Sequence, residues 1–170
     1  MKKILLVVDM QNDFINGTLG SKDAEAIVEK VVDKVKSYEN EESLIIYTKD
    51  THFENYLETE EGKKLPVKHC VKDTNGWEIP SVILRDNKNI IEKYTFGSVD
   101  LFNELNKIEE KIESIELIGL CTDICVVSNA LLAKAYFPNK KIMVDEKCCA
   151  GVTKESHKNA IETMKMCQIE

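Results

Sequence analysis

The segment "IELIGLCTDICVVSNALLAKAYFPNKKIMV" (residues 115–144) decides the fold, because it contains a strand, a helix and a second strand in succession. The apolar run 115–120 is typical of a buried strand. The spacing of apolar residues over 124–137 predicts a helix, which Pro138 ends. A second apolar run, 141–144, returns the chain to the sheet. Strands joined by a helix in this way predict a parallel pair.

The same alternation extends over the rest of the chain. Apolar runs at 4–8, 44–48 and 89–91 are further candidate strands. Helical spacing follows two residues suited to capping, Ser21 and Ser98, and a last helix is expected from about Thr153 to Met166. The inward positions of the first two helices are Ile27, Val31 and Val35, then Phe102, Leu105, Ile108 and Ile112. We therefore predict a doubly wound α/β fold, with a mostly parallel sheet of five to six strands and helices on both faces.

Composition restricts the class of protein. The length of 170 residues suits one domain, residues 1–170. The formal net charge is −7, with the basic residues scattered among the acids, so we expect no nucleic-acid partner. The apolar run near the N-terminus is too short for a signal core or a membrane span. Six cysteines without an export signal favour reduced thiols and a cytoplasmic protein.

Reactive side chains stand where the predicted strands end, the edge at which α/β sheets bind ligands. Asp9 ends the first strand, Lys93 ends the third, and Cys125 begins the helix after the fourth. Amides at a helix start, and a neighbouring lysine, favour a thiolate, so we expect a lowered pKa for Cys125. Cys125 is then a candidate nucleophile, with Asp9 as its proton acceptor. A buried structural cysteine beside an unrelated ion pair is the alternative.

A second group lies just past the 44–48 strand. Asp50 and His52 stand there, and the long segment 51–80 brings back His69. Imidazole and carboxylate ligands suit zinc, and also iron or manganese. Glu61 offers a fourth oxygen. The alternative is a turn-capping aspartate beside two solvated histidines.

Four sets of motifs carry a resemblance over nearly the whole chain. They are "VVDMQNDF" (7–14), "TKDTH" (48–52) with "LPVKHC" (65–70), "EKYTFGS" (92–98), and "GLCTDICV" (119–126) with "DEKCCAGVTKESH" (145–157). The chain resembles the isochorismatase-like cysteine hydrolases, and within them the nicotinamidase branch.

The resemblance implies an amidohydrolase that releases ammonia from a small carboxamide, foremost nicotinamide. It implies a triad of Asp9, Lys93 and Cys125 and a divalent metal, first of all zinc, on Asp50, His52 and His69. A cis peptide between Leu120 and Cys121 is also implied, with the amides of Cys121 and Cys125 forming an oxyanion hole. A homo-oligomer with no membrane or nucleic-acid partner is expected.

One position departs from the family pattern. Nicotinamidases carry a ring-stacking tryptophan three residues before the second histidine ligand, and this chain has Pro66 there. Phe14 matches the other aromatic contact to the substrate, and Trp77 or Tyr94 would be needed to replace the missing one. The alternatives are therefore an amidase for an N-carbamoyl or ureido compound, or a binding protein without turnover.

Overall fold

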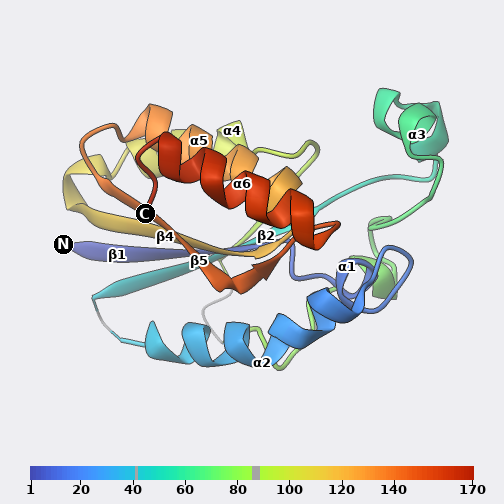
Figure 1. Cartoon of the computed structure of the whole chain (residues 1–170), viewed down its shortest axis with the longest axis horizontal. Coiled ribbons are helices and arrows are strands. Elements are labelled where there is room, and N and C mark those ends of the chain that lie inside the picture. Colours follow the sequence, from blue (N-terminus) through green and yellow to red (C-terminus); the bar gives the residue numbers. More distant parts are fainter. Residues whose placement is uncertain (41, 86–88) are drawn as a thin grey trace.

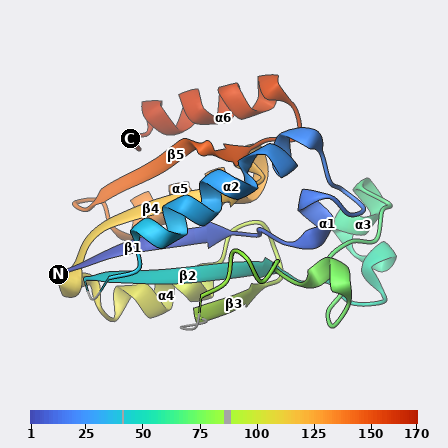
Figure 2. The same ribbon diagram turned by 90° about the horizontal axis from the view of Figure 1, so that it is seen from below.

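The chain folds around a five-stranded parallel sheet (Figure 1), with the strand order β3-β2-β1-β4-β5 that Figure 2 shows. The computed structural model describes residues 1–40, 42–85 and 89–170. The sheet confirms the predicted architecture. Its strands are β1 (Lys2–Val8), β2 (Ser43–Asp50), β3 (Asn89–Lys93), β4 (Ile112–Leu120) and β5 (Lys141–Ala150).

Helices cover both faces of the sheet, and the central strand β1 serves both layers. Ile4, Leu6 and Val8 pack toward one hydrophobic cluster, while Leu5 and Val7 pack toward the other. This alternation is the period of two expected of a strand. Figures 1 and 2 show α2 on one face and α4, α5 and α6 on the other. These helices are α2 (Lys22–Ser37), α4 (Val99–Asn106), α5 (Val127–Tyr136) and α6 (Lys154–Met166).

Both predicted capping residues, Ser21 and Ser98, begin helices as expected, and Thr153 also caps the helix that it was predicted to start. The Ser21 hydroxyl accepts a hydrogen bond from the Ala24 amide at 3.1 Å. Ser98 caps α4 in the same way, and Thr153 forms a reciprocal capping box at the start of α6. Such caps satisfy amides that have no partner within the helix, and each typically contributes about 1 kcal/mol.

Three predicted element boundaries were wrong. Helix α4 ends at Asn106, and Ile112 begins β4 instead of closing that helix. Apolar residues on both sides of a short connection continued the helical spacing by coincidence. Strand β5 runs to Ala150, six residues past the predicted 141–144, with a register shift against β4. The segment 122–126 is a π-helical turn, so α5 proper begins at Val127.

The paired backbones of β1 and β4 leave no room for a side chain at Gly119, just before the carboxyl ends of both strands. Gly119 has a φ of +117°, and a Cβ at this position would overlap the carbonyl oxygen of Val8. Only glycine combines this backbone conformation with so close an approach. The contact lies directly before Asp9 and the turn that carries Cys125.

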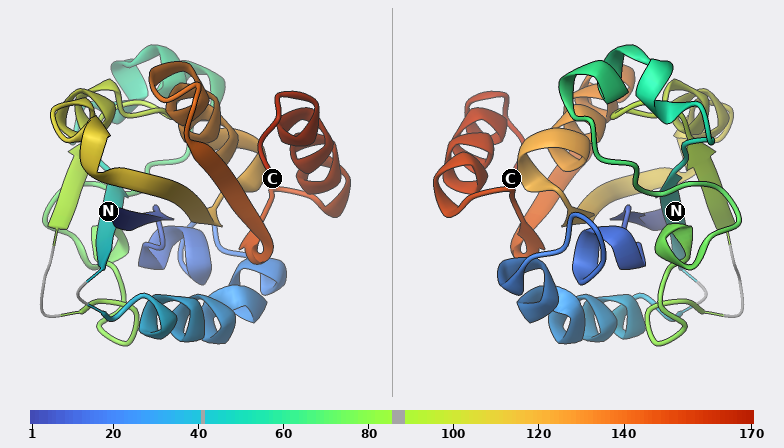
Figure 3. Two further views of the ribbon diagram at one scale, coloured as in Figure 1. Left: turned by 90° about the vertical axis from the view of Figure 1, so that its left-hand side faces the viewer. Right: turned by 90° about the vertical axis from the view of Figure 1, so that its right-hand side faces the viewer.

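The long segment 51–80 gathers with α1 (Asn12–Ile15) at the carboxyl edge of the sheet, as the right-hand view in Figure 3 shows. It contains the short helix α3 (Glu60–Lys64) and two 3₁₀ turns, Tyr56–Glu58 and Asn75–Trp77. Within the described residues, no helix is both long and apolar enough to cross a membrane.

Candidate active site and metal centre

Lys93 is the centre of the first cluster. Its Nζ atom lies 2.7 Å from Oδ2 of Asp9, 2.9 Å from Oδ1 of Asp50 and 3.4 Å from Sγ of Cys125. The side chains of Lys93 and Asp9 are 1% and 0% exposed, so these charges interact without screening by water. The structure thus brings the three predicted triad residues together around one ammonium group.

Burial and mutual charge set the protonation of this cluster. Burial would lower the pKa of Lys93, but the charges of Asp9, Cys125 and Asp50 raise it well above its usual range. Burial raises the pKa of Asp9, and the Lys93 charge only partly opposes that effect. Lys93 therefore stays charged, while Asp9 is disposed to accept a proton.

The expected low pKa of Cys125 was wrong. Burial and the charge of Asp9 raise the pKa of this thiol well above its ordinary value, although Lys93 lowers it. The sequence-based argument considered helix amides and a lysine but not complete burial beside a carboxylate. The resting cysteine is therefore disposed to be a thiol, and a nucleophilic role would require that it first lose its proton.

Three buried polar residues that the sequence analysis missed hold this cluster in place. The Thr48 hydroxyl donates to Oδ1 of Asp9 at 2.7 Å. The Gln11 side chain accepts from the Asp50 amide and donates to the Asp50 carbonyl. Asn129, one turn beyond Cys125 in the helix, donates to the Cys125 carbonyl at 2.8 Å. For Thr48 and Asn129, a polar residue inside a buried strand or helix was the available signal, because burial requires that it find partners.

The second cluster consists of Asp50, His52, Glu61 and His69, each of which offers one ligand atom within 4.8 Å of the others. Nε2 of His52 lies 2.8 Å from Oδ2 of Asp50, and Nε2 of His69 lies 3.7 Å from the same oxygen. Oε1 of Glu61 lies 3.7 Å from His52 Nε2 and 3.8 Å from His69 Nε2. Four side chains thus converge on one point.

The chemistry of these donor atoms fits a divalent metal. The buried Nε2 of His52 makes no hydrogen bond of normal geometry within the described residues, although it lies 2.8 Å from Oδ2 of Asp50. Two atoms that face one point without bonding each other are what a shared ligand such as a metal ion would require. His69 Nδ1 lies 2.8 Å from the Val67 carbonyl oxygen, an arrangement that places the ring proton there and leaves Nε2 free to ligate. Two imidazoles and two carboxylates match zinc, iron or manganese.

Asp50 joins the two clusters. Its Oδ1 contacts Lys93, while its Oδ2 faces the two histidines. Burial raises the pKa of Asp50, but contacts with both histidines and the charge of Lys93 hold it well below its usual value. Asp50 therefore remains an anion that contacts both clusters at once.

The three aromatic residues considered for contact with a substrate ring, Phe14, Trp77 and Tyr94, differ in burial and in the contacts that hold them. Phe14 is half-buried, with its ring centroid 5.5 Å from that of His69, so it does border the metal ligands. Trp77 is buried and fixed by a hydrogen bond from Nε1 to Thr51, and the Lys49 ammonium covers its ring. Tyr94 is 60% exposed and stacks on Phe53. Trp77 is therefore not free to stack on a substrate.

The turn that carries Cys125 (residues 122–126) also contacts a residue outside the sheet. The peptide between Leu120 and Cys121 is cis, as the family resemblance implies. His157, on α6, is half-buried and bonds through Nδ1 to the Thr122 hydroxyl at 2.8 Å. It connects α6 to the turn that carries Cys125 and takes no part in the metal-ligand cluster.

Comparison with known proteins identifies the family and agrees with the fold. The model of the isochorismatase domain matches residues 3–170. A nicotinamidase from Schizosaccharomyces pombe is 25% identical, with 98% of this chain and 90% of the relative covered. The crystal structure of the pyrazinamidase of Pyrococcus horikoshii in complex with zinc superposes with a TM-score of 0.86 at 27% identity, covering 99% and 97% of the two chains. That of a Bacillus subtilis nicotinamidase gives 0.84 at 26% identity, covering 100% and 98%.

Proposed function

The chain belongs to the isochorismatase domain family and is an amidohydrolase, and we propose that it releases ammonia from a small uncharged carboxamide through a Cys125 nucleophile. Conversion of nicotinamide to nicotinate is the leading candidate reaction. The observation that carries the proposal is the position of Lys93 Nζ, in contact with Asp9, Asp50 and Cys125 together. A purely structural ion pair would not require a thiol within the same cluster.

The first half of the reaction forms a thioester. The Cys125 thiol transfers its proton to Asp9 as sulfur attacks the amide carbonyl, and Lys93 stabilises the negative charge on sulfur. The backbone amides of Cys121 and Cys125 are the proposed oxyanion donors, and each such donor typically stabilises the transition state by about 3 kcal/mol. When the carbon–nitrogen bond breaks, Asp9 returns the proton to the departing ammonia.

The second half releases the acid. Asp9, again a carboxylate, takes a proton from a water molecule that attacks the thioester carbonyl. The carbon–sulfur bond breaks, and the proton passes from Asp9 to the Cys125 sulfur. Sulfur, carboxylate and ammonium thus return to their starting states, and one water is consumed for each ammonia released.

Asp50, His52, Glu61 and His69 would hold a divalent metal beside this cluster. When bound, such an ion supplies a Lewis acid that can orient a substrate nitrogen or a water molecule. Phe14 borders the ligands and would contact the substrate ring. With Pro66 exposed at the other aromatic position, the ring has less stacking surface than the family pattern provides.

Charge favours an uncharged amide over an N-carbamoyl acid. Arg85 is the only arginine in the sequence, and its side chain pairs with Glu39 at 2.8 Å. Lys93 is already engaged by two carboxylates. A substrate carboxylate would therefore approach Asp9 and Asp50 without an arginine to bind it, and desolvating it there would be costly.

A panel assay tests the proposal. Ammonia release should be measured with nicotinamide, pyrazinamide and an N-carbamoyl amino acid, using wild-type protein and Cys125→Ala. We expect turnover of the two ring carboxamides only, and only by the wild type. Faster turnover of the carbamoyl acid would contradict the substrate class. No turnover of any compound by intact, zinc-loaded protein would favour the binding-protein alternative.

A further inference from the structure

We propose that Asp13 is a positioning residue for the histidine ligands and so sets the metal affinity of the site. The inference rests on the proposed metal centre. Asp13 lies on α1, is half-buried, and is not one of the four residues whose ligand atoms converge. Its carboxylate instead binds the backbone of the loop that carries His69.

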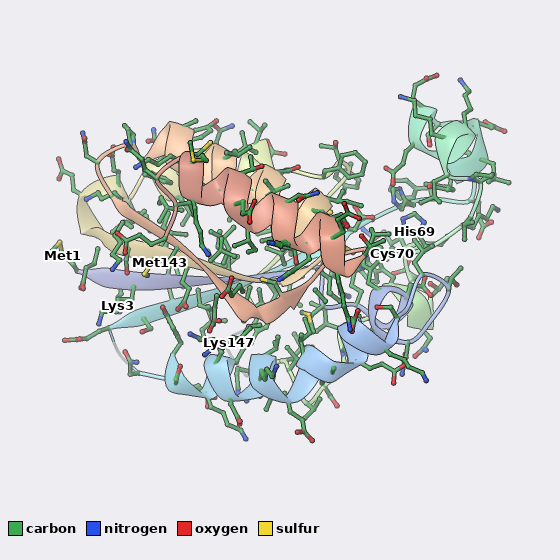
Figure 4. All side chains as sticks on the ribbon, viewed as in Figure 1. Met1, Lys3, His69, Cys70, Met143 and Lys147 are labelled. Atoms are coloured by element: carbon green, nitrogen blue, oxygen red, sulfur yellow. The ribbon has the colours of Figure 1, made fainter. Side chains whose placement is uncertain are left out.

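The link between Asp13 and the ligands is the Cys70 peptide. Oδ2 of Asp13 accepts a hydrogen bond from the Cys70 amide at 2.7 Å, and that amide belongs to the peptide unit that begins with the His69 carbonyl. The Cys70 carbonyl in turn accepts a hydrogen bond from the His52 amide at 3.0 Å. One residue, held by Asp13, thus connects the backbones of both histidines. Figure 4 shows His69 and Cys70 together between α3 and α1.

Cys70 needs such a tether because of its backbone conformation. Its φ is +46°, the left-handed region, which costs a residue other than glycine about 1–2 kcal/mol. A loop residue keeps this conformation only where surrounding contacts impose it. The Asp13 hydrogen bond is such a contact, and without it Cys70 would be held through its carbonyl by the His52 amide alone, so that the peptide after His69 would fix the imidazole less firmly.

The surrounding loop is built closely around the Asp13 side chain. Its Oδ1 accepts from both the amide and the hydroxyl of Thr18. A Cβ on Gly76 would overlap the carboxylate, and one on Gly17 would lie 2.7 Å from Oδ1. Glycine on both sides leaves room for a carboxylate in one fixed orientation, as a positioning role requires.

Asn12 provides a matched control. It neighbours Asp13 on α1, is also half-buried, and ties the same loop through Nδ2, which donates to the Asn75 carbonyl at 2.7 Å. It does not bind the Cys70 peptide. Asp13→Ala, Asp13→Asn and Asn12→Ala therefore separate the positioning of the histidines from general anchoring of the loop.

The test is zinc affinity, measured by competition with a chromophoric chelator on the full chain, with circular dichroism to verify folding. Loss of an outer partner of a metal ligand typically weakens binding about 10- to 100-fold. We expect that loss for Asp13→Ala, a smaller loss for Asp13→Asn, which keeps one acceptor oxygen, and a change under about twofold for Asn12→Ala. If Asp13→Ala does not fold, Asp13→Asn is compared with Asn12→Ala in its place.

Two results would overturn the proposal: wild-type affinity in both Asp13 variants, or an equal loss in Asn12→Ala. Failure of the wild-type protein itself to bind zinc would refute the metal centre, and this inference with it. Ammonia release by that zinc-free protein would show that the cysteine chemistry stands separately.

Discussion

The proposed nucleophile cluster (Asp9, Lys93 and Cys125) and the proposed metal-ligand cluster (Asp50, His52, Glu61 and His69) adjoin but are held in different ways. Asp9 follows β1, Lys93 ends β3, and Cys125 lies in the turn after β4, so the sheet itself fixes all three. Of the metal-ligand cluster only Asp50 lies on a strand, while the other three residues come from the segment 51–80. A sheet resists displacement through many cooperative hydrogen bonds, whereas a loop depends on a few side-chain tethers. A substitution in one cluster should therefore change the properties of that cluster and leave the other cluster unchanged.

The largest expected effect is at the sulfur. Cys125→Ala removes the nucleophile, and we expect turnover in the ammonia assay to fall by about 10⁴-fold or more. The sheet and the zinc affinity should be unchanged, because the residue contributes to neither. Appreciable residual hydrolysis by this variant would contradict covalent catalysis.

Asp9→Asn should increase the reactivity of the Cys125 thiol and decrease turnover. The Asp9 charge raises the pKa of Cys125, so its removal lowers that pKa and increases the thiolate fraction at neutral pH. We therefore expect faster alkylation of Cys125 by iodoacetamide, detected by mass spectrometry. The proton acceptor is lost at the same time, so turnover should fall about 10²- to 10⁴-fold. Slower alkylation than in the wild type would mean that Asp9 is not what keeps the thiol protonated.

Removal of a proposed metal ligand from the segment 51–80 should affect zinc binding and not the reactivity of Cys125. His69→Ala should lower zinc affinity by more than the roughly 100-fold limit typical of outer partners, because it removes a ligand outright. The rate of Cys125 alkylation in zinc-free protein should stay close to that of zinc-free wild type, since Lys93 and Asp9 remain in place. A large change in that rate would show that the loop also positions the nucleophile.

Asn129→Ala should have the smallest effect, a loss of folding stability with no change in zinc binding. The side chain bonds the Cys125 carbonyl, the Phe96 carbonyl and the Ser98 amide, and it is fully buried. Leaving buried partners unsatisfied typically costs about 1–3 kcal/mol, so chemical denaturation should show a loss of about that size. Zinc affinity should not change. Equal stability of variant and wild type would mean that water replaces the amide.

The sequence predicted what depends on pattern and order. Apolar runs located the five strands, and the ends of parallel strands had to gather Asp9, Lys93 and Cys125 at one edge. Ile112 was assigned to a helix because apolar spacing alone does not mark where a helix gives way to a strand.

Features that depend on contacts distant in sequence could not be predicted. The raised pKa of Cys125 comes from burial beside Asp9, and neither the depth of burial nor that neighbour is written in the local sequence. Gln11, which donates to the Trp77 carbonyl of the long loop, and Asp13, which accepts from the Cys70 amide, follow no periodic pattern. The cis peptide before Cys121 came from the family resemblance and not from the residues themselves.

The close approach of β1 and β4 at Gly119 bears on how much the interior can vary. Main chain meets main chain there, so the backbone itself, and not the size of interior side chains, sets the spacing between Asp9 and the Cys125 sulfur. Relatives could then exchange aliphatic residues in the two hydrophobic clusters without changing the distance between these two side chains. A single methyl group added at this glycine would wedge the strands apart at the one point where such tolerance ends.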